Sequence, residues 1–235
     1  MTNVSRTSLC ALVPIYNEEK FLEKSVLGLI NTSIFDQIIL INDCSTDNSE
    51  IVIRKLADNH SEIEYLKTDK NSGKGSALSQ SKKLINTSHV VIHDADLEYS
   101  PSDIHNMFEV SKNNTNSLIL GSRFIGNKER KNIYLRTKLA NKYMSLFFSF
   151  VNNYRVSDVA TCYKLMPTKF FLKHNFYEKG FSIEIEMLSK FLKYNPSIIE
   201  VPISYTGRSY SEGKKIKTLD GFKYLYSTMK YRFIT

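Results

Sequence analysis

Short apolar runs alternate with longer amphipathic segments through the first half of the chain. Five runs have the length and composition of buried strands: LCALVPIY (9–16), QIILIND (37–43), IEYLKT (63–68), HVVIHD (89–94) and SLILGSRF (117–124). The segments between them, at 18–32, from 48 onward, at 76–86 and from 101 onward, carry apolar residues at helical spacing. This alternation predicts an α/β fold with a mostly parallel sheet that helices cover on both faces.

The second half is expected to contain longer helices and fewer strands. Helices are predicted at 133–151 and 181–194, a short strand or turn at 161–167 (TCYKLMP), and a strand at 197–205 (SIIEVPISY). A polar, basic loop, RSYSEGKKIK, follows, and the C-terminal segment repeats apolar residues at the spacing of an amphipathic helix. Neither a repeat nor an interdomain linker is visible in the sequence, so a single domain is expected.

Carboxylates follow two of the predicted strands. The strand HVVI leads into Asp94 and Asp96, with Glu98 two residues further on, and Asp43 ends the strand QIILIND. The carboxyl ends of parallel strands share one edge of a sheet, where ligands bind, so these side chains and Arg123 are expected to lie together. Carboxylate oxygens in this arrangement suit Mg²⁺ or Mn²⁺. The tripeptide Asp94-Ala95-Asp96 is of a common D-x-D type, however. The alternative is that Asp96 caps a helix while Asp94 is solvated.

Several other charged residues have two open interpretations. The loop NSGKGSAL (71–78) lacks the spacing of a Walker phosphate loop, so its glycines are expected to form a tight turn that brings Lys74 near a nucleotide. Asp158, Glu184 and Glu186 are acidic residues in a basic half, where they either pair with Lys or Arg or work in the site. The 5 histidines lack the spacing of metal ligands.

The charge is divided unevenly between the two halves. Residues 1–117 carry 11 Lys and Arg against 16 Asp and Glu, net −5, and residues 118–235 carry 21 against 8, net +13. A basic half suits phosphates, on a nucleic acid or at a membrane surface. A nucleic-acid-binding module is therefore one alternative, although zinc-finger, basic-helix and aromatic–basic patterns are missing from the sequence.

Targeting signals and cysteines bear on the compartment. No apolar run approaches the roughly 18 residues of a membrane span, and the N-terminus does not have the pattern of a signal peptide. The 3 cysteines are scattered, which argues for a reducing compartment and against a disulfide framework. We therefore expect a cytoplasmic protein, with peripheral attachment to the cytoplasmic membrane face as an open alternative.

Five motifs in order resemble those of family 2 glycosyltransferases of the GT-A fold. They are VPIYNEE (13–19), INDCSTDNS (41–49), GKGSAL (73–78), DADLEYSP (94–101) and GSRF (121–124). The chain looks most like the dolichol-phosphate mannose and glucose synthases, the polyprenyl-phosphate branch. SDVATCYK (157–164), FSIEIEML (181–188) and RSYSEGKKIKTLDGF (208–222) extend the resemblance over nearly the whole chain.

The resemblance implies an inverting, metal-dependent enzyme that takes a hexose from GDP-mannose or UDP-glucose. It implies a single GT-A domain over 1–235, with a nucleotide-sugar-binding half (1–125), an acceptor half (126–218) and the amphipathic helix (219–235). The nucleotide sugar would be bound by Pro14, Tyr16, Glu18, Asp43, Lys74, Asp94, Ala95 and Asp96. Asp94, Asp96 and Glu98 would bind the Mg²⁺ or Mn²⁺ that neutralises the leaving diphosphate, with relatives often having Gln where this chain has Glu98.

The acceptor decides which further residues are needed. A polyprenyl phosphate is already an anion and needs only cations, for which Arg123, Arg136, Arg208 and Lys214 are the candidates, with Lys215 a looser one. A hydroxyl of a surface glycan needs a general base, for which Asp158 and Glu184 are the candidates. The basic second half favours the phosphate, and the candidate catalytic residues are Asp96, Arg123 and Asp158.

Two further points stay open at this stage. Many relatives carry transmembrane helices or borrow them from a partner subunit, and here the segment 219–233 is expected either to lie in the membrane interface or to pack onto the domain. A catalytically inactive scaffold of the same fold is a further alternative, which the intact DAD motif disfavours.

Overall fold

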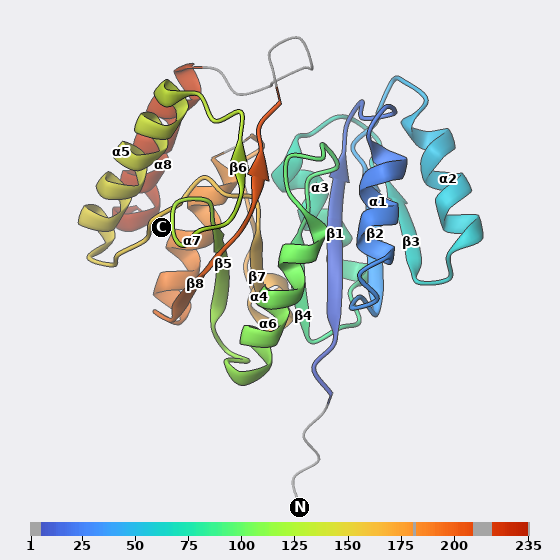
Figure 1. Cartoon of the computed structure of the whole chain (residues 1–235), viewed down its shortest axis with the longest axis horizontal. Coiled ribbons are helices and arrows are strands. Elements are labelled where there is room, and N and C mark those ends of the chain that lie inside the picture. Colours follow the sequence, from blue (N-terminus) through green and yellow to red (C-terminus); the bar gives the residue numbers. More distant parts are fainter. Residues whose placement is uncertain (1–5, 181, 209–217, 235) are drawn as a thin grey trace, which may run out of the picture.

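The computed structural model describes residues 6–180, 182–208 and 218–234. Within them, seven strands form one sheet in the order β3-β2-β1-β4-β7-β5-β8 (Figure 1). The strands are β1 (Leu9–Ile15), β2 (Gln37–Asn42), β3 (Ile63–Lys67), β4 (His89–Ile92), β5 (Leu118–Ser122), β7 (Lys164–Pro167) and β8 (Ile198–Pro202). A second, two-stranded sheet pairs β6 (Arg130–Lys131) with β9 (Tyr205–Thr206). The predicted mostly parallel α/β fold is confirmed.

Strand β7 is the exception to the parallel arrangement. It pairs antiparallel with β4 on one side and with β5 on the other, whereas the other neighbours in the large sheet are parallel. The sequence left this segment as a strand or a turn, and it is an internal strand of the sheet, between β4 and β5. Its insertion joins the first half of the chain to β5 and β8, so that both halves share one core.

Helices cover both faces of the large sheet. In the view of Figure 1, α1 (Leu22–Ile30), α2 (Ser49–Asn59) and α4 (Pro101–Asn113) lie in front of it. Behind it lie α3 (Lys74–Gln80), the 3₁₀ helix η1 (Ser81–Leu84), α6 (Thr168–Lys173) and α7 (Ile183–Tyr194). Every residue of β2 is buried between the two layers, and each fully buried Ile or Leu contributes about 2 kcal/mol.

Two helix boundaries differ from the sequence prediction. The helix expected at 18–32 is α1, which begins at Leu22 because the chain turns at Asn17, whose φ is 54°. The helix expected at 76–86 begins earlier, at Lys74, and tightens into η1 after Gln80. Gly73 has a φ of 86°, a conformation that favours glycine, and this turn sends Lys74 directly into α3.

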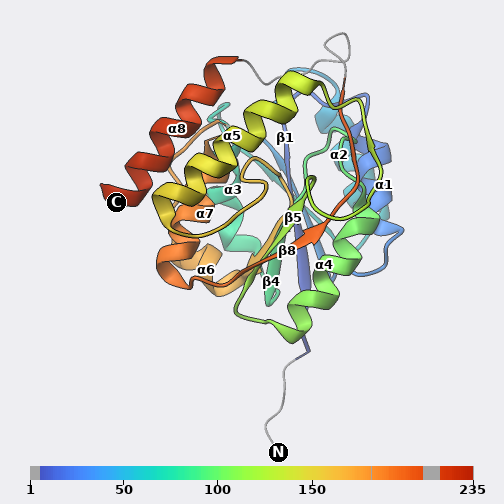
Figure 2. The same ribbon diagram turned by 60° about the vertical axis from the view of Figure 1, so that its left-hand side comes forward.

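The two remaining helices lie beside the end of the sheet formed by β5 and β8. They are α5 (Leu135–Asn152) and α8 (Thr218–Phe233), which pack against each other, and α8 also packs against α7 (Figure 2). The predicted long and C-terminal helices are thus present. None of the helices in the described ranges has the length and apolar character needed to cross a membrane.

Candidate active site

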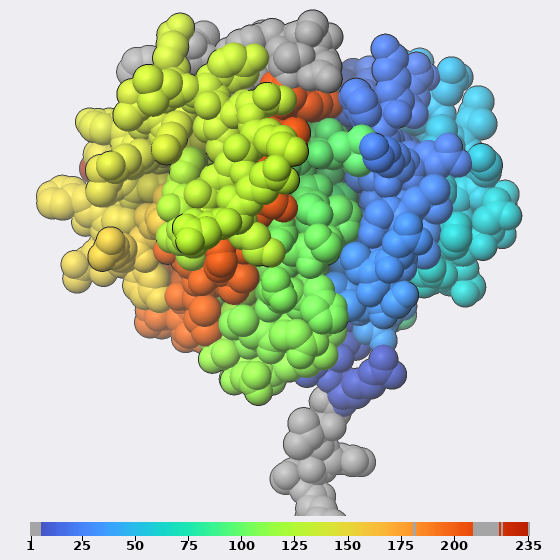
Figure 3. Space-filling model, viewed as in Figure 1, coloured from blue at the N-terminus to red at the C-terminus, as the bar shows by residue number. Residues whose placement is uncertain are grey.

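A cavity of about 650 Å³ opens beyond the carboxyl ends of β1, β2, β4 and β5, where the topology predicts a ligand. The segment 126–155, lime to yellow, forms much of the left-hand surface in Figure 3. Its helix α5 contributes to the cavity wall. The cavity lining includes these residues that the sequence singled out: Pro14, Tyr16, Glu18, Asp43, Lys74, Asp94, Ala95, Asp96, Glu98, Arg123, Arg136, Glu184 and Arg208. Lys214 and Lys215 fall outside the described residues. Asp158 is fully buried behind Arg123.

Two basic side chains form ion pairs with the carboxylates after β4. The Lys74 ammonium lies 2.9 Å from Asp94 Oδ1, and the Arg208 guanidinium donates through Nη2 to Asp96 Oδ2 at 3.1 Å. Arg208 also donates through Nη1 to Glu18 Oε2 at 3.2 Å. The alternative that Asp96 caps a helix is not what the structure has, because α4 begins after Ser100 and Asp96 accepts instead from the Glu98 N–H within the turn.

Glu98 is more fully occupied by protein donors. Its Oε1 accepts a hydrogen bond from the Arg208 backbone N–H at 2.8 Å, and its Oε2 accepts one from the Tyr205 hydroxyl at 2.7 Å. These bonds tie β9 and Arg208 to the turn that carries Asp94 and Asp96. The arrangement favours an orienting role for Glu98 over direct coordination of a metal.

The site has more negative than positive charge. Burial, with Asp94 and Glu98 nearby, raises the pKa of Asp96 to about 7, and Arg208 only partly offsets this. Burial also opposes the charge of Asp94, but Lys74 outweighs it and lowers the pKa of that carboxyl. In the described part of the chain these carboxylates do not form a ready-made cluster of metal ligands. Their oxygen donors and surplus charge nevertheless fit a hard divalent cation, with Asp94 and Asp96 as the residues to hold it.

Asp43 organises the glycine loop beside the cavity. Its Oδ2 accepts a hydrogen bond from the Gly73 N–H at 2.7 Å, and its Oδ1 accepts from the Ser72 N–H at 3.1 Å and the Thr68 hydroxyl at 3.0 Å. Most of its acceptor capacity is therefore used inside the protein. Asp43 fixes the turn that positions Lys74, and it lines the cavity at the same time.

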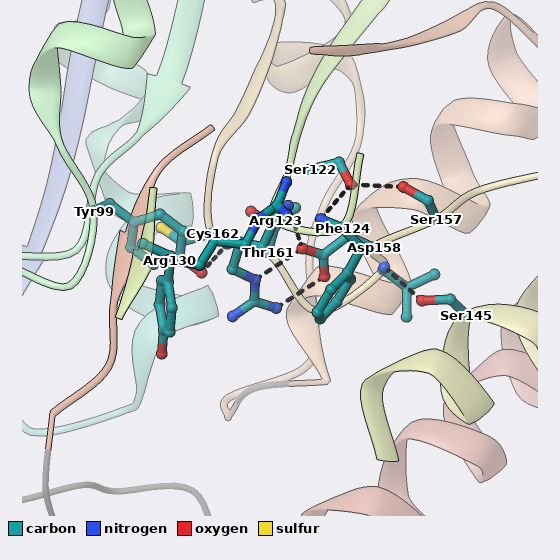
Figure 4. Close-up of polar contacts among 12 residues, drawn as sticks. Tyr99, Ser122, Arg123, Phe124, Arg130, Ser145, Ser157, Asp158, Thr161 and Cys162 are labelled. Atoms are coloured by element: carbon teal, nitrogen blue, oxygen red, sulfur yellow. Dashed lines mark hydrogen bonds and ion pairs between the residues drawn. The ribbon is translucent and has the colours of Figure 1, made fainter. Parts of the chain in front are cut away.

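Arg123 and Asp158 form a buried, bidentate ion pair (Figure 4). Asp158 Oδ2 accepts from Arg123 Nε, Oδ1 accepts from Nη2, both at 2.8 Å, and Oδ2 also accepts from the Arg123 backbone N–H at 3.0 Å. Nη1 makes no hydrogen bond to the described residues and points away from Asp158 in Figure 4. The rings of Tyr99 and Tyr205 lie 5.9 and 5.0 Å from the guanidinium carbon and hold it at the cavity.

The family is decided by a match over most of the chain. The model of the family described as "Glycosyl transferase family 2" matches residues 10–174. The chain belongs to this family. The match covers β1 to α6, and hence the strand ends that carry Asp43, Asp94, Asp96 and Arg123.

Relatives with named activities extend the similarity to the second half of the chain. The chain is 27% identical over 232 residues to the UDP-N-acetylglucosamine–dolichyl-phosphate N-acetylglucosaminyltransferase of Methanococcus voltae, covering 92% of both chains. It is 25% identical over 230 residues to the dolichol-phosphate mannosyltransferase of Pyrococcus furiosus, covering 94% of this chain and 63% of that protein. The protein is therefore a glycosyltransferase with relatives among the dolichyl-phosphate sugar transferases, as its motifs predicted.

A solved structure supports the GT-A fold. Glucosyl-3-phosphoglycerate synthase from Mycobacterium tuberculosis, in complex with Mn²⁺, UDP and glucosyl-3-phosphoglycerate, superposes with a TM-score of 0.69 at 17% identity. The match covers 96% of this chain and 80% of that chain. At this identity the likeness bears on the fold alone, and it confirms the predicted fold class.

Some residues at the site of this glycosyltransferase were not singled out from the sequence. Lys164 on β7 is fully buried and contacts Glu184, while Tyr99 and Tyr205 flank Arg123. A lysine inside the apolar run TCYKLMP was the one available signal, because a buried lysine requires a partner. The tyrosines carried no such signal, since aromatic residues are common in any core.

Proposed function

We propose that the protein is an inverting, metal-dependent glycosyltransferase that moves one sugar from a nucleotide sugar to a polyprenyl phosphate. The observation that carries the proposal is Arg123. Asp158 fixes two of its guanidinium nitrogens, and the third points away from Asp158, beside the cavity that contains Asp94 and Asp96. A fixed cation near the donor site suits an anionic acceptor.

On the donor side, Asp94 and Asp96 are proposed to hold the Mg²⁺ or Mn²⁺, which when bound supplies positive charge to the departing diphosphate. Lys74 lies 2.9 Å from Asp94 and is placed to contact the same diphosphate. Pro14, Tyr16, Glu18 and Ala95 line this end of the cavity and are proposed, with Asp43, to bind the nucleoside. Donors of the UDP and GDP classes are both candidates, since the named relatives include both an N-acetylglucosaminyl and a mannosyl transferase.

In the proposed reaction, an oxygen of the acceptor phosphate attacks the anomeric carbon as the bond to the donor diphosphate breaks. Displacement from the opposite face inverts that carbon. The phosphate oxygen is already anionic, so no base has to remove a proton. Arg123 is proposed to hold this phosphate, with Arg136 on the cavity wall as the second cation.

A hydroxyl acceptor is the second candidate, and the two proposed bases make it less suitable. Both oxygens of Asp158 are bonded to Arg123, and the carboxylate is fully buried. The oxygens of Glu184 are bonded to Lys74 and Lys164. Neither carboxylate is placed to accept a proton without breaking an ion pair. Arg208, predicted for the acceptor phosphate, contacts Glu18 and Asp96 on the donor side instead.

The outer face of α5 supports a lipid-linked acceptor. Leu135, Leu139, Tyr143, Leu146 and Phe150 repeat at intervals of three or four residues and are all exposed, from 57% to 86%. Arg136, Lys138 and Lys142 lie on the same helix, and the neighbouring α8 exposes Tyr226, Met229 and Phe233. Apolar side chains flanked by basic ones suit the interface of an anionic membrane. We propose that this surface lies on the membrane, with the cavity wall beside it.

Transfer assays test this function. The purified protein is incubated with Mn²⁺ and radiolabelled UDP-N-acetylglucosamine, UDP-glucose or GDP-mannose, each with and without a short polyprenyl phosphate. Lipid-dependent label in the organic phase with one donor is the expected result. Asp96→Asn is the matched control for metal dependence and should lose transfer. Donor cleavage with no label in the lipid phosphate from any of the three donors would contradict the proposal.

Membrane attachment is tested separately by flotation with liposomes that contain anionic lipid. Phe150→Ser removes the most exposed apolar side chain of the α5 stripe, and Ile51→Ser removes a comparably exposed one on α2. We expect the first variant to float less than the wild type and the second to float equally. A wild-type protein that stays wholly at the bottom of the gradient would refute the membrane surface and leave the transfer reaction untouched.

A further inference from the structure

Four charged side chains of alternating sign run from the core to the donor end of the cavity. Lys164 on β7 donates to Glu184 Oε2 on α7 at 2.5 Å. Glu184 Oε1 accepts from Lys74 at 2.8 Å, and Lys74 lies 2.9 Å from Asp94 Oδ1. This row of four side chains links the interior of the sheet to Asp94, a carboxylate of the DAD motif.

The inner end of this row of side chains, Lys164 and Glu184, is buried from solvent. Lys164 is fully buried and contacts, within the described ranges, Glu184 and the Thr161 carbonyl oxygen. Glu184 is 2% exposed, and each of its oxygens is bonded to a lysine. Burying a lysine is costly unless it has a partner, so Lys164 holds Glu184 in one position. Glu184 thereby has a fixed oxygen to offer to Lys74.

The backbone around Lys74 is fixed by the same helix. Glu186, two residues after Glu184, accepts hydrogen bonds from the backbone N–H groups of Tyr177 and Glu178. The carbonyl oxygen of Glu178 lies so close to Gly75 that an added Cβ would sit 2.0 Å from it. Helix α7 therefore braces both the backbone and the ammonium of the Lys74 loop.

Lys74 has two anionic partners, and they would respond differently to a ligand. A cation that binds Asp94 would repel the ammonium, whereas a diphosphate would attract it. With Glu184 in place, Lys74 keeps a partner outside the cation site and remains beside the diphosphate. Without Glu184, its nearest remaining carboxylate is Asp94, for which it would compete with the cation.

We propose that Glu184, backed by Lys164, is a positioning residue that holds the Lys74 ammonium for the donor diphosphate. The inference rests on the proposed donor site. It gives Glu184 a role other than that of a base. It also gives a reason for the buried lysine that begins β7, whose other residues are apolar. Outer partners of this kind commonly change affinity or activity by about tenfold or more.

Calorimetric titration of UDP and GDP, each with Mn²⁺, tests the proposal without relying on turnover. Glu184→Gln is expected to raise the dissociation constant of the bound nucleotide about tenfold. Glu50→Gln is the matched control, since Glu50 on α2 is, like Glu184, bonded to two basic side chains, Arg54 and Lys67, and has no bond to Lys74. That variant should bind nucleotide as the wild type does.

The double variant Lys164→Met/Glu184→Gln separates positioning from folding. Glu184→Gln alone leaves Lys164 buried without a charged partner and should lower the midpoint of thermal unfolding. The double variant removes both inner charges, so its midpoint should return towards that of the wild type while its nucleotide affinity stays low. Recovery of both would overturn the proposal, because the pair would then serve stability alone. Glu184→Gln binding within twofold of the wild type would also overturn it. A wild type that binds neither nucleotide would overturn the proposed function itself, and with it this inference.

Discussion

Replacing Asp158 by Asn removes one charge from a buried ion pair and leaves the shape of the side chain nearly unchanged. Asp158 is fully buried, and it accepts three hydrogen bonds from Arg123 at 2.8, 2.8 and 3.0 Å. Breaking such a pair costs about 3–5 kcal/mol, because the remaining charge stays buried. An amide oxygen in the place of Oδ2 still accepts the bonds from the Arg123 backbone N–H and Nε, so we expect a loss of about 3 kcal/mol. For a chain of this size that corresponds to about 6–12 °C in the midpoint of thermal unfolding.

The matched control is an ion pair of the same length at the surface. Glu23 lies 2.8 Å from Lys55, and both side chains are well exposed. Glu23→Gln is expected to cost under about 1 kcal/mol, and so to shift the midpoint by less than about 4 °C. Thermal unfolding followed by circular dichroism measures both shifts. Equal midpoints for the two variants would refute the stabilising role of the buried pair.

Kinetics of Asp158→Asn distinguish two roles for Asp158, fixing the position of Arg123 or acting as a general base. If Asp158 holds Arg123, then Asp158→Asn should raise the KM for the acceptor phosphate and keep the shape of the pH profile. If Asp158 were the base, kcat would fall by about 10²-fold or more, and the limb of the profile due to its ionisation would vanish. Loss of that limb with an unchanged midpoint would contradict the reading of Asp158 as a structural partner.

Two further predictions concern the loop and the acid stability of the fold. Gly75→Ala should lower the midpoint of thermal unfolding and weaken nucleotide binding together, since the new Cβ would lie 2.0 Å from the Glu178 carbonyl oxygen. Gly180→Ala is the control, because a Cβ added at Gly180 has no atom within 4 Å. A Gly75→Ala protein with the midpoint and affinity of Gly180→Ala would refute the close approach. Burial is the main cause that lowers the pKa of His93 to about 4, whereas the pKa of an unfolded histidine is about 6.5. As the pH falls from 7.5 to 5.0, the unfolded state therefore gains a proton that the folded state does not gain. That removes about 2 kcal/mol from the free energy of unfolding, and urea titrations of the wild type and His93→Gln should differ by this amount in their pH dependence; equal slopes would contradict it.

The order of strands and helices was predictable because each follows from a local period in the sequence. QIILIN has four apolar residues in succession and is buried throughout, and the spacing of apolar residues from 101 onward predicted the helix α4. Direction and neighbours in the sheet are not local properties. Nothing in KLMP indicates that β7 runs antiparallel between β4 and β5, since its partners lie 44 or more residues away in the chain.

The candidate site divides in the same way. Asp43, Asp94 and Arg123 were expected together because the topology places strand ends at one edge, and the cavity contains all three. Pairings between distant residues were left open. Asp158 is 35 residues from Arg123, and Glu184 is 110 residues from Lys74. The sequence offered each carboxylate an ion pair or a catalytic role, and only the folded chain shows the ion pairs.

Arg208 connects the two sides of the proposed reaction. It lies at the end of β9, beside the segment 209–217, whose lysines were predicted for the acceptor, yet its guanidinium contacts Glu18 and Asp96 at the donor end. A cation bound at Asp96 would repel the guanidinium, and an incoming phosphate would attract it. Because the Arg208 backbone N–H is bonded to Glu98, the side chain can move while its Cα stays in place. The role of Arg208 at the acceptor phosphate therefore stays a prediction, and its contacts in the structure belong to the donor end.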